Sequence, residues 1–100
     1  MKALLIDPTE QTIEAIDVTD AADIAAIIGY DTIETDEVGD AGDRLHFDEE
    51  CFIRGTKGRF RIDSLIPVAG KGVVVGQGAD GGLADVAINI EALRARTRFL

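Results

Sequence analysis

Residues 2–18 read KALLIDPTEQTIEAIDV, and this stretch decides the fold class. The apolar run at residues 2–6 stops at Asp7-Pro8, a pair that opens turns because proline restricts the residue before it. Residues 12–18 form a second run, which is rich in β-branched side chains that favour strands. The two runs predict a β-hairpin, with a possible bulge where Ile13 and Ile16 break strict alternation.

The sequence after the hairpin predicts a helix that begins with a cap at Thr19 or Asp20 and stops at Gly29. Three isoleucines share one face of this helix because of their i, i+3, i+4 spacing: Ile24, Ile27 and Ile28. The helix is short, so packing on a sheet rather than propensity must hold it. A second, C-terminal helix is expected after a cap at Asn89.

The remaining chain predicts short strands at residues 31–38, 44–48, 51–53, 60–62 and 71–75. The runs at 51–53 and 60–62 flank Gly55–Gly58 and predict a second hairpin. Pro67 marks an edge or a connection, and Phe99-Leu100 can return to the sheet. The predicted fold is one compact α+β domain over residues 1–100, a mostly antiparallel sheet with one packed helix and a short C-terminal helix.

Composition excludes several classes of protein. The chain has 100 residues, 46% hydrophobic and 29% charged, which is ordinary for a folded domain and not for a disordered tail. Its apolar runs are far shorter than the roughly 20 residues of a membrane span, and no secretory signal is recognisable. Cys51 is the only cysteine, which excludes a disulfide framework and a multi-cysteine zinc site. We expect a cytoplasmic protein.

Charge is distributed unevenly along the chain. Residues 1–50 carry 15 acidic and two basic side chains, whereas residues 51–100 carry four acidic and eight basic ones. The net charge of -9 argues against nucleic acid or anionic lipid as a direct ligand and favours a basic partner. The alternative is that the acidity only keeps a small protein soluble.

Three patterns suggest chemistry without completing it. Residues 76–81 match G-x-G-x-x-G after a predicted strand, but no helix or second parallel strand follows to complete a dinucleotide site, so a hairpin or loop is favoured. The acidic run around residues 36–50 lacks the spacing of a calcium-binding EF-hand. His46 shares one side of a predicted strand with Asp48, and Cys51 is near them in the sequence. Residues this close seldom converge as a nucleophile pair, so Cys51 is expected in the core. We therefore predict no enzyme, cofactor or metal.

Basic residues gather at one turn and near the C-terminus: Arg54, Lys57, Arg59 and Arg61, then Arg94, Arg96 and Arg98. A basic hairpin can contact phosphate, but no tyrosine or tryptophan is interleaved for base stacking. Pairing with the acidic half, within the molecule or between copies, is the favoured use.

The chain resembles a family of small uncharacterised proteins carried by phages and other mobile elements. The resemblance rests on four landmarks in order: residues 3–8 (ALLIDP), residues 42–50 with GDRL and DEE, an isolated Phe60, and residues 66–76 (IPVAGKGVVVG). It implies an accessory gene acting in a bacterial cytoplasm, and it carries no catalytic residue.

The leading hypothesis is a non-enzymatic binding protein whose carboxylates imitate phosphates and occupy a basic groove on a host protein. Given the resemblance, its concrete form is an inhibitor of a nucleic-acid-directed defence, of the anti-restriction or anti-CRISPR kind. The candidate partner-binding residues are Asp31, Glu34, Asp36, Glu37, Asp40, Asp43, Asp48, Glu49 and Glu50.

Two alternatives remain open. The first is a small-ligand or nucleotide-binding accessory protein that uses Gly70–Gly82 and the basic turn at Arg54–Arg61. The second is a homo-oligomeric structural accessory in which the acidic and basic halves meet between copies.

Overall fold

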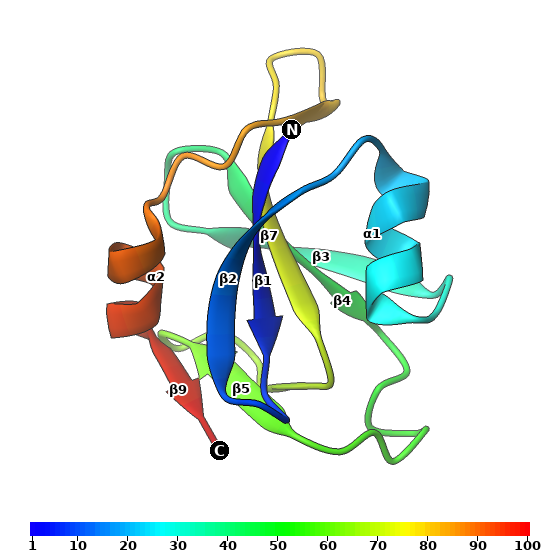
Figure 1. Ribbon diagram of the computed structural model, residues 1–100. Coiled ribbons are helices and arrows are strands. Elements are labelled where there is room, and N and C mark those ends of the chain that lie inside the picture. Colours follow the sequence, from blue (N-terminus) through cyan, green and yellow to red (C-terminus); the bar gives the residue numbers. More distant parts are fainter.

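The computed structural model describes residues 1–100 and has two sheets and two helices (Figure 1). The strands are β1 (Lys2–Asp7), β2 (Thr12–Asp17), β3 (Ile33–Val38), β4 (Asp43–Asp48), β5 (Arg59–Ile62), β6 (Val68–Ala69), β7 (Gly72–Gln77), β8 (Leu83–Ala84) and β9 (Thr97–Phe99). The helices are α1 (Ala21–Ile28) and α2 (Ile90–Arg96). Neither helix is long and apolar enough to cross a membrane.

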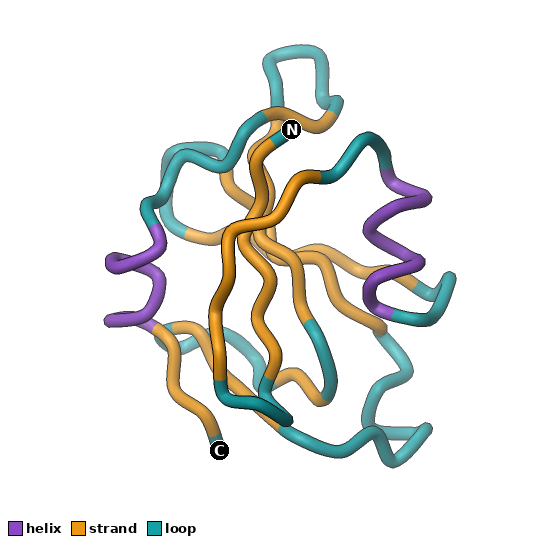
Figure 2. Tube along the Cα trace, in the orientation of Figure 1, coloured by secondary structure: helices purple, strands orange, loops and turns teal.

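All strand pairs are antiparallel, which confirms the predicted α+β class. The large sheet has the order β2-β1-β7-β4-β3, and β8 adds a short pairing to β7. The small sheet has the order β6-β5-β9. Strands β2 and β3 are therefore the two edges of the large sheet. Figure 2 shows the strands in the middle of the molecule and the two helices on opposite sides of them.

The large sheet is covered on both faces, and its central strand β7 shows why. Val73 and Val75 pack in one apolar cluster with Ile24 and Ile28 of α1. Val74, which alternates with them, packs in a second cluster with residues of the small sheet and of α2. The continuous apolar run of β7 is thus explained by burial on both sides, and the molecule has three layers (Figure 1).

Both predicted helices begin where their caps were expected. The side chain of Asp20 accepts a hydrogen bond from the backbone N–H of Asp23 at 3.0 Å, and Gly29 ends α1 with a φ of 96°. Asn89 caps α2 in the same way through the N–H of Ala92, at 2.8 Å. These side chains satisfy backbone donors that the first helical turn leaves free.

The first predicted hairpin is confirmed and the second is wrong. β1 and β2 pair in continuous register from Lys2 opposite Asp17 to Asp7 opposite Thr12, with no bulge. Residues 51–53, by contrast, form consecutive turns rather than a strand. β5, the expected partner of residues 51–53, pairs instead with β6 and β9. An edge near Pro67 and a return of Phe99 to a sheet were expected, but their pairing with β5 was not.

Candidate functional site

The acidic residues gather along β3, one free edge of the large sheet. β3 pairs only with β4, so its other side has no neighbouring strand. Glu34 and Glu37 are exposed and Asp36 is partly exposed. Because side chains alternate along a strand, Glu34 and Asp36 project from one face of the sheet and Glu37 from the other. The carboxylates therefore share an edge rather than a face.

Two flanking turns extend this edge. Asp31 precedes β3, and Asp40 lies in the turn that joins β3 to β4. Glu49 follows β4 and donates its backbone N–H to the carbonyl of Thr32 at 2.8 Å, which places it beside the start of β3. We call the set the acidic edge: Asp31, Glu34, Asp36, Glu37, Asp40 and Glu49. None of its carboxylates forms an ion pair or a hydrogen bond within the chain.

Asp43 was expected on this surface, and the structure places it in the core instead. Its side chain is 1% exposed. One carboxylate oxygen accepts the backbone N–H of Ala87 and the other accepts that of Ile88, each at 2.8 Å. Asp43 therefore anchors the irregular segment before α2 to the end of the large sheet, and has no free oxygen to offer a partner.

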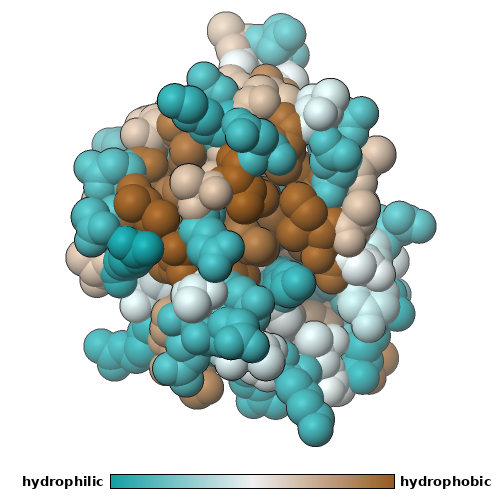
Figure 3. Space-filling view, in the orientation of Figure 1, coloured by the Kyte–Doolittle hydropathy of each residue, from teal (hydrophilic) through white to brown (hydrophobic).

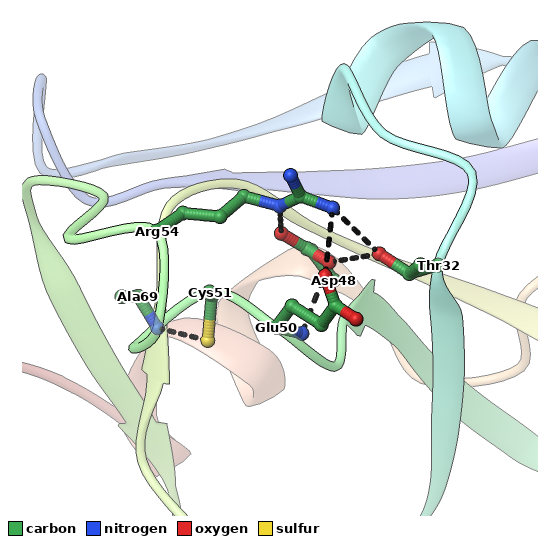
Figure 4. A network of polar contacts seen from close by, with 6 residues as sticks. All are labelled: Thr32, Asp48, Glu50, Cys51, Arg54 and Ala69. Carbon is green, nitrogen blue, oxygen red and sulfur yellow. Dashed lines mark hydrogen bonds and ion pairs between the residues drawn. The ribbon is translucent and has the colours of Figure 1, made fainter.

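Asp48 is likewise buried, at the other end of β4 (Figure 4). It accepts hydrogen bonds from the hydroxyl of Thr32, from the backbone N–H of Glu50 at 3.1 Å and from Nε of Arg54 at 2.8 Å. Glu50 also pairs with Arg54, at 3.2 Å. Burial alone would raise the pKa of Asp48, but these hydrogen bonds outweigh it and hold the pKa below its ordinary value.

Cys51 is buried, as expected, and His46 lies partly buried on the face of the sheet that α1 covers. The Sγ of Cys51 accepts the backbone N–H of Ala69 at 3.4 Å, so the thiol fixes β6 to the turns after β4 (Figure 4). Burial, with a smaller contribution from nearby Arg44, lowers the pKa of His46 below its usual range. His46 and Cys51 form no hydrogen bond with each other, and no group of three or more His, Cys, Asp or Glu side chains is placed to hold a metal ion.

The glycine-rich run is a hairpin, as favoured above. Gly78 donates its N–H to the carbonyl of Gly82 at 2.7 Å, closing the turn between β7 and β8. Gly76 is needed for packing, because a Cβ there would lie 2.2 Å from the carbonyl oxygen of Asp85. Gly70 lies before the opposite end of β7. The glycines of residues 70–82 therefore do not surround one site.

A cavity of about 430 Å³ lies between the C-terminal end of α1 and three turns. Lys57 and Lys71 line it together with Tyr30, and neither lysine forms an ion pair. Arg54 stacks on the ring of Tyr30 with its Cζ 4.0 Å from the ring centre. The small-ligand alternative named two of its walls, Lys57 of the basic turn and Gly70 of the glycine-rich run. It missed the wall formed by Tyr30 and the end of α1, because that segment is distant in the chain.

A second depression is apolar and lies between β1, β2 and the segment before α2. It is lined by Leu4, Ala15, Ile16, Val86 and Ile88 among others. Hydrophobic side chains gather in the middle of the face drawn in Figure 3, over β1 and β2.

Comparison of the chain with protein-family models, with curated proteins and with solved structures finds no match. The resemblance to mobile-element proteins therefore stays a prediction.

Replacing Asp43 by alanine tests its structural role. We expect Asp43→Ala to lower the free energy of unfolding by about 2 kcal/mol or more, because the N–H groups of Ala87 and Ile88 lose their acceptors. The measurement is urea denaturation followed by circular dichroism. Asp40→Ala is the control, since an exposed neighbour without partners changes stability by less than about 0.5 kcal/mol. Equal stability of the two variants would contradict this role.

Acid should destabilise the fold in two steps. The pKa of His46 is lower in the folded protein than the ordinary value of about 6.5 in the unfolded chain. Below about pH 6.5 the unfolded chain therefore binds a proton at His46 more readily than the folded protein does, so the free energy of unfolding falls as the pH drops. Asp48 and Asp63, whose folded pKa values are lowered, contribute stability above about pH 4 that is lost as the pH falls further.

Urea titrations at several pH values measure both steps. His46→Gln should remove the first step and leave the second, since His46 is the only histidine. An unchanged first step in this variant would show that another group is responsible.

Proposed function

We propose that the chain is a non-enzymatic binding protein whose acidic edge enters a basic, nucleic-acid-binding groove of a partner protein. Its concrete form is an inhibitor of a nucleic-acid-directed defence of restriction or CRISPR type, for which the support is the resemblance to mobile-element proteins. The observation that carries the proposal is that the acidic edge has six carboxylates without a partner in a chain that has ten Lys and Arg residues.

The geometry of the edge supports this function. Glu34, Asp36 and Glu37 stand on a regular strand, so their spacing is fixed by the sheet rather than by a flexible loop. Asp31 and Glu49 extend the row at one end and Asp40 at the other. A six-residue strand is about 20 Å long, so the carboxylates form an extended row of negative charge.

Electrostatics determines how such an edge would act. Carboxylates would take the place of phosphates on the arginines and lysines that line the groove. Association of this kind is fast, because opposite charges steer the encounter, and it weakens as salt screens them. Arg44 lies opposite Glu37 in the register of β3 and β4, but it forms no ion pair with Glu37 and its Nε donates to the hydroxyl of Thr35 at 3.0 Å. One cation beside six carboxylates leaves the row strongly negative.

A matched pair of charge variants tests the proposal. Glu34→Gln, Glu37→Gln and Asp40→Asn together should abolish capture of nucleic-acid-binding proteins from a nuclease-treated bacterial lysate, because three exposed carboxylates of the edge are removed. Capture is read by mass spectrometry, and proteins held by the unmodified chain should be released by a DNA oligonucleotide at constant ionic strength.

The control removes the same charge from the other edge of the large sheet, by Glu10→Gln, Glu14→Gln and Asp17→Asn. This control should capture the same proteins as the unmodified chain. Equal capture by both triple variants, or proteins that DNA does not release, would refute the proposal.

The cavity beside α1 supports a second candidate function, the binding of a small anionic ligand. Its two unpaired lysines, Lys57 and Lys71, offer positive charge, and Ile27 and Tyr30 offer an apolar wall. The volume of about 430 Å³ is in the range of small-molecule sites.

Thermal denaturation with and without nucleotides tests this candidate. A ligand that binds only the folded state raises the melting temperature, and Lys57→Gln with Lys71→Gln should remove that rise. Lys2→Gln, which lies outside the cavity, should keep it. If no nucleotide stabilises the unmodified chain, or the double variant responds equally, the cavity does not bind nucleotides.

A further inference from the structure

The outer face of the small sheet carries three arginines. Arg59 and Arg61 alternate with the buried residues Phe60 and Ile62 along β5, so both arginines project away from the core. Arg98 of β9 lies directly opposite Arg61 in the antiparallel register. Residues opposite each other on one face have Cβ atoms about 5 Å apart, so these side chains are close neighbours. We call this set the arginine face: Arg59, Arg61 and Arg98.

The arginine face is distinguished by its lack of acceptors. The other four arginines have partners within the chain: Arg44 with Thr35, Arg54 with Asp48, Arg94 with Glu91 and Arg96 with Asp63. No side chain of the arginine face forms an ion pair or a hydrogen bond, although the chain has 19 carboxylates. Three of the other arginines are thus paired with carboxylates, whereas the arginine face has no carboxylate partner.

Two features of this arrangement are unfavourable for the isolated chain. Arg61 and Arg98 place like charges opposite each other on paired strands, which destabilises a sheet. The Nε of Arg61 is also the one buried side-chain nitrogen or oxygen that has no hydrogen-bond partner. Buried polar groups are nearly always satisfied, so an exception of this kind calls for a specific explanation.

Exposed apolar side chains lie next to this face. The guanidinium of Arg59 stands over the ring of Phe52, with its Cζ 5.2 Å from the ring centre, and Phe52 is 47% exposed. Leu100 is 60% exposed, and its backbone N–H donates to the carbonyl of Arg59 at 2.9 Å. An accessible aromatic ring thus stands beside unpaired guanidinium groups.

We propose that the arginine face binds single-stranded nucleic acid. The planar guanidinium donates two parallel hydrogen bonds to a phosphate. Because no carboxylate occupies Arg61 and Arg98, both can bind the phosphates of a nucleic-acid backbone. The ring of Phe52 offers a surface on which an unpaired base stacks. The carboxylates of an acidic protein segment could pair with the same arginines, but they would make no stacking contact with the exposed ring of Phe52.

The net charge, on which the expectation of no nucleic-acid contact rested, does not oppose this assignment at short range. Charges separated by more than about 8 Å are largely screened at physiological salt. The acidic edge belongs to the other sheet, on β3 and its flanking turns. This inference is independent of the proposed function, because it uses a different surface and a different partner.

Fluorescence anisotropy of a labelled oligothymidine tests the inference. Arg61→Gln with Arg98→Gln should weaken binding about tenfold or more, since two charged donors to phosphate are lost. Each lost phosphate contact should also reduce the slope of log K against log salt by about 0.7. The control, Lys2→Gln with Arg94→Gln, removes the same charge elsewhere and should bind like the unmodified chain.

Thermal denaturation of the same variants separates binding from folding. The arginine double variant should melt at the same temperature as the unmodified chain or higher, because a repulsive cross-strand pair is removed. Weaker binding with an equal or higher melting temperature supports the inference.

Three outcomes would overturn the inference: no binding by the unmodified chain, equal loss in the control, or polyglutamate binding as tightly as the oligonucleotide. Chromatography with light scattering adds a fourth, since salt-sensitive self-association through Arg61 and Arg98 would make a second copy the occupant.

Discussion

Strand β4 begins and ends with a buried carboxylate, and much of the irregular chain depends on these two groups. An ionised side chain is unfavourable in the interior unless hydrogen bonds compensate the loss of water. Asp43 is compensated by the N–H groups of Ala87 and Ile88, and Asp48 by Thr32, the N–H of Glu50 and Arg54. One aspartate therefore fixes the segment that leads into α2, and the other fixes the turns that carry Cys51 and Phe52.

The ion pairs within the chain determine which charged side chains remain without a partner. Arg54 donates a hydrogen bond to Asp48, and its guanidinium stacks on Tyr30 at the wall of the cavity. Arg96 pairs with Asp63, which lowers the pKa of that carboxyl and ties the end of α2 to the end of β5. Arg54 and Arg96 are therefore engaged within the chain and are not free to bind a partner. Among the charges that remain without a partner are the acidic edge on the large sheet and the arginine face on the small sheet.

The sequence predicted the elements whose signals are local. Residues 2–18 carry their own turn and alternation, and Asp20, Gly29 and Asn89 cap helices through contacts within one turn. The small sheet could not be predicted in this way, because β5 pairs with β9 from the far end of the chain. Residues 51–53 are apolar enough for a strand, yet Cys51 is buried by contact with β6 rather than by strand pairing.

The same limit applies to the candidate site. The distribution of carboxylates along the sequence identified the acidic half of the chain. It could not show that Asp43 and Asp48 are buried while their neighbours are exposed. Their burial depends on contacts with residues 85–90 and with Arg54, which come from other parts of the chain. With the two surfaces on different sheets, intramolecular pairing cannot cancel the charge asymmetry of the chain. A charged partner consequently meets a molecule whose field has a direction, so that steering favours one orientation of approach over the reverse. A uniformly acidic surface of the same net charge would attract a basic partner without orienting it.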